Sequence, residues 1–195
     1  MKLQDRLPDS VTVWGRKYRL NLDFRNVLRL METMARDDLI PGARDYLALK
    51  CVMRRPPRDA ARVLEEVRKL LFPAQKPADG KRLTSFEQDA DLIRAAFRQA
   101  YGIDLYRDRL HWVEFSALLS ALPEGSRYSE VLGIRARPMP AATKYNQAER
   151  EWLAKAKAAC ALEMSEDERR RAYAEGVKSV FAGLLAWAEG SEKHG

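Results

Sequence analysis

The stretch SFEQDADLIRAAFRQAYGIDLYRDRLHWVEFSALLSAL, residues 85–122, determines the class of fold. Its apolar residues recur every three or four positions, the spacing of one helix face, first over 86–100 and again over 109–122. Ser85 and Gln88 have capping-box spacing, and Gly102 is suited to end the first helix in the left-handed conformation. The stretch therefore predicts two helices joined by a short turn.

The rest of the chain extends the same pattern on both sides. Apolar periodicity predicts helices near 24–34, 43–53, 59–71, 126–134 and 146–162. In the helix near 43–53 we expect inward-facing Tyr46, Leu47, Cys51 and Val52, and in the helix after Asn146 we expect inward-facing Trp152, Leu153, Ala156, Cys160 and Leu162.

A β-hairpin is predicted before the first helix. A two-residue loop at Gly15-Arg16 would pair Val13 with Tyr18 and Val11 with Leu20, which places these apolar residues on one face. Glycine at the first loop position favours a type II′ turn. The predicted fold is mostly α, a compact multi-helix domain with a small N-terminal β-hairpin and a C-terminal helical extension.

Two regions are expected. Residues 1–145 form the hairpin and the helical core, with a flexible joint near 73–84, where the composition is typical of a loop. Residues 146–195 form C-terminal helices, and we expect the last of these to pack back on the core. Its apolar residues alternate in steps of four and three, like a coiled-coil seam: Tyr173, Val177, Val180, Leu184 and Trp187.

Composition restricts the class of protein. The chain has 195 residues, of which 46% are hydrophobic, with no apolar run long enough to cross a membrane and no apolar signal-peptide core. We therefore expect an intracellular protein, with Cys51 and Cys160 as buried thiols. The net charge is +7, and residues 1–82 hold the whole basic excess, with 19 Lys/Arg against 11 Asp/Glu, which favours an acidic partner.

Residues capable of catalysis are scarce. His111 is either a general base or a helix-start residue, and no nucleophile or metal-ligand spacing accompanies it. Asp89 and Asp91 point to different helix faces and are expected to be first-turn acids. No glycine-rich phosphate loop occurs. The sequence predicts no catalytic residue, cofactor or metal site, and hence a protein that is not an enzyme.

Candidate partner-binding residues come from a basic cluster and from two tryptophans. Acidic residues interrupt the cluster and no nucleic-acid-binding motif accompanies it, so a solvated face or a docking patch for an acidic protein segment is favoured over nucleic acid. We expect Trp112 and Trp152 in the core and the other two exposed. The candidates are Arg54, Arg55, Arg58, Arg62, Trp14 and Trp187.

Two motifs in the central stretch resemble the bacteriophage gene-product-fifteen family of tailed phages and prophages of Gram-positive bacteria. Asp-Ala…Ile…Ala-Phe…Tyr-Gly-Ile-Asp-Leu is followed at matching distance by Leu-His-Trp…Phe…Leu-Leu…Leu, and the similarity covers about residues 8–162, including the later Ile134-Arg135 step. Val113 stands where the family often has a bulky residue. The motif residues, expected to be structural, are Asp89, Ile93, Phe97, Tyr101, Gly102, Ile103, Asp104, Leu105, His111, Trp112 and Phe115.

The resemblance implies a tail assembly chaperone that holds the helical tape-measure protein in the host bacterial cytoplasm before the tail tube polymerises. It implies no catalytic residue. A structural component of the virion tail and, more weakly, a nucleic-acid-binding regulator are the alternatives. The expected partners are the tape-measure protein or other tail proteins, and self-association is left open.

Overall fold

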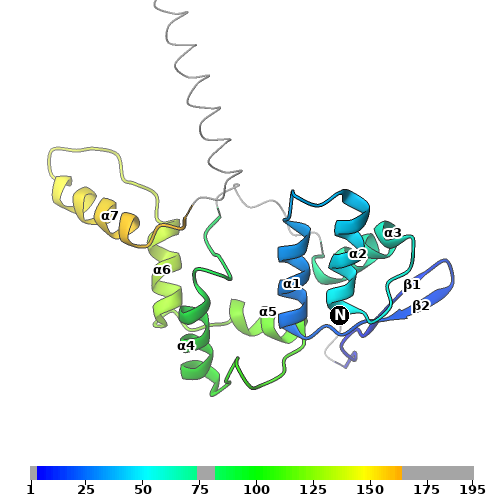
Figure 1. The fold of residues 1–195 in the computed structure, drawn as a ribbon. Coiled ribbons are helices and arrows are strands. Elements are labelled where there is room, and N and C mark those ends of the chain that lie inside the picture. Colours follow the sequence, from blue (N-terminus) through cyan, green and yellow to red (C-terminus); the bar gives the residue numbers. More distant parts are fainter. Residues whose placement is uncertain (1–3, 74–81, 164–195) are drawn as a thin grey trace, which may run out of the picture.

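The described residues of the computed structural model, 4–73 and 82–163, form a mostly helical fold with one small hairpin (Figure 1). This confirms the predicted fold class. The helix predicted to start at Ser85 begins at Ala90, and the one predicted near 109 begins at Trp112. The elements in chain order are β1 (Ser10–Val13), β2 (Arg16–Arg19), α1 (Phe24–Met34), α2 (Pro41–Val52), α3 (Ala60–Leu71), α4 (Ala90–Tyr101), α5 (Trp112–Ser120), α6 (Arg127–Ala136) and α7 (Gln147–Ala159).

The hairpin exists, but its predicted register and turn type are wrong. Val13 pairs with Arg16 and Val11 pairs with Tyr18, so the loop is Trp14-Gly15. Both loop residues have positive φ, 50° and 75°, which is the type I′ geometry that matches the twist of the strands. The shift from the predicted pairing is two residues, so the buried Val11 and Val13 still share one face.

Three helices pack beside the hairpin. α2 packs against α1 and α3, and α3 also contacts β1. The inward face predicted for α2 is wrong except for Val52, because the buried residues are Ala48, Leu49 and Val52. Tyr46 and Leu47 are exposed and Cys51 is half-buried, since the two neighbouring helices meet α2 along a face rotated from the predicted one.

α5 joins this layer to the second half of the chain. Its Phe115 stacks on Phe24 of α1, with ring centroids 4.6 Å apart, and on Phe97 of α4 at 5.3 Å. All three rings are buried. One hydrophobic core therefore runs from the hairpin to α6.

The last described helix lies at the edge of the fold. α7 packs on α6 and buries Leu153, and it extends away from the other helices in Figure 1. The core position predicted for Trp152 is wrong, because its side chain is 56% exposed. The predicted burial of both thiols is also wrong: Cys51 and Cys160 are half-buried and unpaired with each other.

Two predicted features include residues that the structure does not describe. Residues 74–81 of the predicted joint and the predicted helix after Ser165 lie outside the described residues. The described end of the joint is held by hydrogen bonds, since Arg135 donates to the carbonyl of Leu83 at 2.9 Å and the hydroxyls of Thr84 and Tyr128 lie 2.8 Å apart.

Candidate interaction surface

The Leu110-His111-Trp112 segment ties the two halves together through its backbone. The Phe24 N–H donates to the Leu110 carbonyl at 3.0 Å, and the Trp112 N–H donates to the Leu22 carbonyl at 2.8 Å. These bonds place the start of α5 directly beside the start of α1. The segment acts as a structural junction between chain segments about 90 residues apart.

Both ring nitrogens of His111 are engaged in this junction. Nδ1 accepts the Val113 N–H at 3.1 Å and caps α5, while Glu114 accepts the His111 N–H at 3.2 Å. Nε2 lies 2.9 Å from the Pro8 carbonyl, and because a carbonyl only accepts, the ring proton resides on Nε2. Of the two interpretations of His111, the geometry supports the helix-start residue.

The side chain of Trp112 packs between the end of α3 and the rings of Phe72 and Phe86. It is buried, as predicted, and its indole N–H donates to the Leu71 carbonyl at the end of α3, at 3.1 Å. The rings of Phe72 and Phe86 meet it edge-on. Trp112 therefore anchors α3 to α5 with a satisfied polar group as well as apolar area.

Asp89 and Arg135 form a buried ion pair. The guanidinium donates two hydrogen bonds to the carboxylate, each 2.8 Å long, and the Ser85 N–H donates a third at 2.9 Å. Asp89 is 1% exposed. Arg135 also donates to the carbonyls of Leu83 and Cys160. One pair therefore connects the start of α4, the end of α6 and the end of α7.

The ion pair keeps the carboxylate charged. Burial by itself raises the pKa of Asp89, but the hydrogen bonds from Arg135 and the Ser85 N–H outweigh it and leave the pKa below its ordinary value. The hydrogen bond to Asp89 raises the pKa of Arg135. Asp91 lies in the first turn of α4 and Asp89 lies at its N-cap, on different faces as expected. The sequence did not predict that the charge of Asp89 is paired with a partner 46 residues away.

The remaining motif residues shape the turn after α4. Gly102 ends the helix with φ of 69°, and the Tyr101 hydroxyl donates to the Leu118 carbonyl at 2.9 Å. Asp104 accepts from the Tyr106 N–H and from Arg98. Hydrogen bonding by the Tyr106 N–H is the chief reason that the pKa of Asp104 is lowered. Ile93, Phe97 and Leu105 are buried and Ile103 packs on the core.

A groove of about 370 Å³ opens between α1 and α4. Leu28 of α1 and Ile93 of α4 face it, and Phe115 of α5, the helix that lies between them in Figure 1, forms its base. Its other apolar lining residues are Phe24, Phe86, Ala90, Leu105 and Tyr106. A volume in the range of about 300–1,000 Å³ with an apolar lining is typical of small-molecule and cofactor sites.

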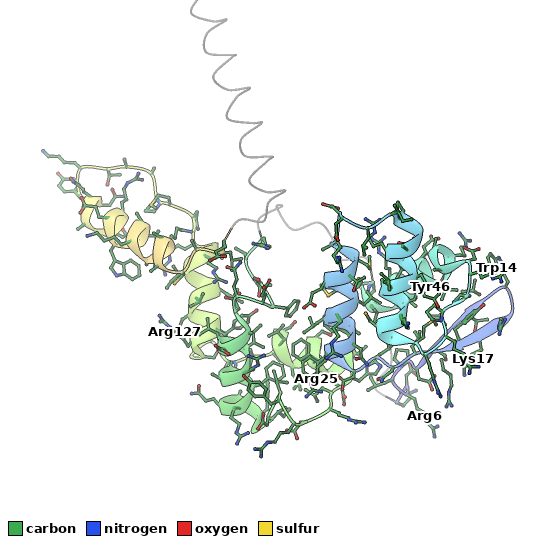
Figure 2. All side chains as sticks on the ribbon, in the orientation of Figure 1. Arg6, Trp14, Lys17, Arg25, Tyr46 and Arg127 are labelled. Atoms are coloured by element: carbon green, nitrogen blue, oxygen red, sulfur yellow. The ribbon has the colours of Figure 1, made fainter. Side chains whose placement is uncertain are left out.

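Arginines surround this groove. Arg25, Arg29 and Arg94 line it against a single carboxylate, Glu32. Arg25, labelled in Figure 2, donates to the carbonyls of Leu105 and Asp108 and so holds the turn after α4 against α1. The Arg94 guanidinium lies 4.4 Å from the ring centroid of Tyr106. The opening is therefore apolar inside and edged by arginines, of which Arg25 pairs with Asp23 at 3.2 Å and Arg94 pairs with Asp91 at 2.9 Å.

A comparison with protein families identifies the chain. The family described as Bacteriophage Gp15 protein matches residues 3–162. The chain belongs to the bacteriophage Gp15 protein family. No curated protein and no solved structure matches it. Membership in the Gp15 family makes this a bacteriophage protein and indicates a structural or assembly protein, whose expected partners are other phage proteins.

The partner-binding candidates that the structure describes do not gather at the groove of this Gp15 protein. Trp14 is 73% exposed at the hairpin tip, beside Lys17 and far from Arg25 in Figure 2. Trp187 lies outside the described residues. Arg54, Arg55 and Arg58 are exposed on the segment before α3, and Arg62 on α3 pairs with Glu65 at 3.2 Å.

Sequence reasoning missed the groove residues for a physical reason. Leu28 on α1 is half-buried, and Arg29 belongs to no motif. The groove exists only because α5 separates α1 from α4. Among the described residues no cluster of His, Cys, Asp or Glu has metal-binding geometry, and no described helix is long and apolar enough to span a membrane.

Proposed function

We propose that this Gp15-family protein is a non-enzymatic tail assembly chaperone that binds amphipathic helices of the tape-measure protein in the groove between α1 and α4. The tape-measure partner comes from the family resemblance. The groove is the observation that supports helix binding.

The groove has the chemistry for such a partner. A helix-in-groove complex needs an apolar channel that takes side chains at helical spacing. The half-buried Leu28 and Phe86 and the exposed Tyr106 supply accessible apolar surface there, above the buried ring of Phe115. The exposed Arg29 at the edge favours a helix with an acidic residue beside its apolar face, because opposite charges steer association and fix orientation. A helical chain held there is kept from aggregating through its apolar face.

The first experiment is co-expression with the tape-measure protein of the same phage. The proposal expects more soluble tape-measure protein and its co-purification with this chain. No gain in solubility and no co-purification would contradict it. Mass spectrometry of purified virions separates the two assembly roles, because a chaperone is absent from the mature tail and a structural component is present.

The second experiment assigns binding to the groove. Leu28→Ala removes apolar surface, and Arg29→Glu reverses a charge at the edge. Each is expected to weaken tape-measure binding about tenfold, equivalent to roughly 1.4 kcal/mol. The matched controls are Ile40→Ala, an exposed apolar residue that does not line the groove, and Arg127→Glu on α6. Equal loss in the variants and their controls would exclude the groove as the binding surface.

A further inference from the structure

A second hollow in the surface lies at the base of the hairpin. This hairpin cleft, of about 610 Å³, lies between residues 19–21 at the end of β2 and residues 50–54 at the end of α2. The Asn21 N–H donates to the Val52 carbonyl at 2.7 Å and joins the two walls. The cleft is therefore built from two segments that are distant in the sequence and fixed to each other.

The charged side chains of the hairpin cleft are mostly cations. Arg19, Lys50 and Arg54 line it against one carboxylate, Asp9, so the lining carries a net charge of +2. All three cations are exposed, and in the part of the chain that the structure describes none of them forms an ion pair. Two of the three arginines at the groove between α1 and α4, by contrast, are paired with aspartates. The hairpin cleft therefore offers positive charge that no carboxylate of the described chain compensates.

The end of α2 at this cleft would by itself disfavour an anion, because the C-terminus of a helix carries partial negative charge. Two of its last carbonyls are already occupied, since Leu49 accepts the Met53 N–H and Val52 accepts the Asn21 N–H. Lys50 lies in the last turn and opposes the remaining dipole. The cations therefore decide the sign of the field in the cleft.

The lining favours carboxylates of a protein segment over phosphates of a nucleic acid. No described residue of the lining is aromatic, so unpaired bases would find no ring on which to stack. A duplex binder typically neutralises roughly 6–10 phosphates, whereas this cleft presents three cations and a carboxylate that repels phosphate. Arg19 and Arg54 can each pair with a carboxylate through two parallel hydrogen bonds. The exposed side-chain amide of Asn21 can donate to a peptide carbonyl.

The hairpin cleft and the groove lie on different sides of α1. Asn26, which lines the cleft, lies roughly 160° around the helix from Leu28, which lines the groove. In Figure 1, α4 lies on one side of α1 and the hairpin lies on the other. One ligand in each site can therefore be bound at the same time.

We propose that the hairpin cleft binds an acidic segment of a partner protein, whose carboxylates pair with Arg19, Lys50 and Arg54. This site goes beyond the proposed chaperone function and does not depend on a helix in the groove. It also gives a role to Arg54, the member of the basic cluster in the sequence that lines the cleft.

The thiol of Cys51 reports whether the cleft is occupied. Cys51 is half-buried and lines the cleft, whereas Cys160 is half-buried at the end of α7 and serves as the internal control. The probe is a short peptide of alternating Glu and Ser, and the control peptide has Gln in place of Glu. At about ten times its Kd, the Glu peptide is expected to slow the alkylation of Cys51 in the full chain about tenfold by mass action. The alkylation of Cys160 should not change, and the Gln peptide should slow neither reaction.

Charge reversals supply a second readout. Arg54→Glu and Lys50→Glu are each expected to weaken binding of the Glu peptide about tenfold, equivalent to roughly 1.4 kcal/mol. The matched controls are Arg137→Glu at the end of α6 and Lys155→Glu on α7, both exposed and far from the hairpin in Figure 1. They should leave the affinity nearly unchanged, because salt screens charges that are more than about 8 Å apart. Circular dichroism of each variant establishes that the described fold is retained.

Four results would overturn the proposal. These are no protection of Cys51 by the Glu peptide, equal protection of Cys51 and Cys160, equal losses in the cleft variants and their controls, and stronger protection of Cys51 by a single strand of thymidine nucleotides than by the Glu peptide. The last result would assign the cleft to nucleic acid. Leu28→Ala in the groove should leave peptide binding unchanged, so this proposal and the proposed function can fail separately.

Discussion

Replacing Asp89 by asparagine removes one charge from the buried ion pair with almost no change in shape. Asp89 is 1% exposed, and two of its three principal hydrogen bonds come from the Arg135 guanidinium at 2.8 Å. Removing one partner of a buried pair leaves the other charge uncompensated, which costs about 3–5 kcal/mol. Arg135 keeps its bonds to the carbonyls of Leu83 and Cys160, so we expect the lower end, about 3 kcal/mol.

Urea unfolding measures this loss. With a slope of about 2 kcal/mol per molar, a loss of about 3 kcal/mol lowers the unfolding midpoint by roughly 1.5 M. Asp91→Asn is the matched control, because Asp91 lies on the same helix and pairs with Arg94 at 2.9 Å while its side chain is 93% exposed. An exposed pair contributes about 0–1 kcal/mol. Similar losses for Asp89→Asn and Asp91→Asn would refute the reasoning from burial.

The same pair predicts a dependence on pH. The pKa of Asp89 is lower in the folded chain than its ordinary value of 3.8, so the ionised carboxylate stabilises the fold above that value. The contribution is lost as the pH falls through the folded pKa. We therefore expect the difference in stability between the natural chain and Asp89→Asn to be constant from pH 5 to 7 and to shrink below about pH 4. If the stability difference between the two proteins grew as the pH fell, the predicted direction of the Asp89 pKa shift would be refuted.

Substitutions at three further positions test the junction and the turn, each by the shift in the urea midpoint. Gly102→Ala is expected to cost about 1 kcal/mol, because φ is 69° there and nothing lies within 4 Å of an added Cβ, so the cost is backbone strain alone. Trp112→Phe leaves the buried Leu71 carbonyl without its donor and is expected to cost at least about 1–3 kcal/mol. His111→Ala removes the cap of α5 and should cost about 1–2 kcal/mol, whereas His111→Asn keeps a cap acceptor and should recover part of it. Equal stability of the two His111 variants would contradict a capping role.

Helix positions followed well from local signals. Asp23 accepts the Arg25 N–H and starts α1, Gly102 ends α4 in the left-handed conformation, and α2 ends at Val52 before the Pro56-Pro57 pair. Each of these signals acts through residues close in the chain. Most apolar residues of α3 lie on one side of the helix and are buried: Val63, Leu64, Val67 and Leu71.

Helix orientation followed less well where the pattern is ambiguous. α2 carries apolar residues on several sides, so the face that it buries depends on where α1 and α3 lie. Trp152 was expected inside because it is large and apolar, but α7 meets only α6 and that contact is made through Leu153. The observed pairing of the hairpin strands differs from the predicted pairing by two residues. The reason is that positive φ at both Trp14 and Gly15 gives a turn whose twist fits the strands.

The sequence by itself determined the helical class, most helix ends and the membership of the Gp15 family, because caps, breakers and motifs act over a few neighbouring residues. Only the tertiary structure decided that Asp89 meets Arg135, that His111 and Trp112 join the two halves, and that an apolar groove edged by arginines opens between α1 and α4. These features depend on which distant segments pack together. That choice is set by the burial of the whole core, which no local pattern contains.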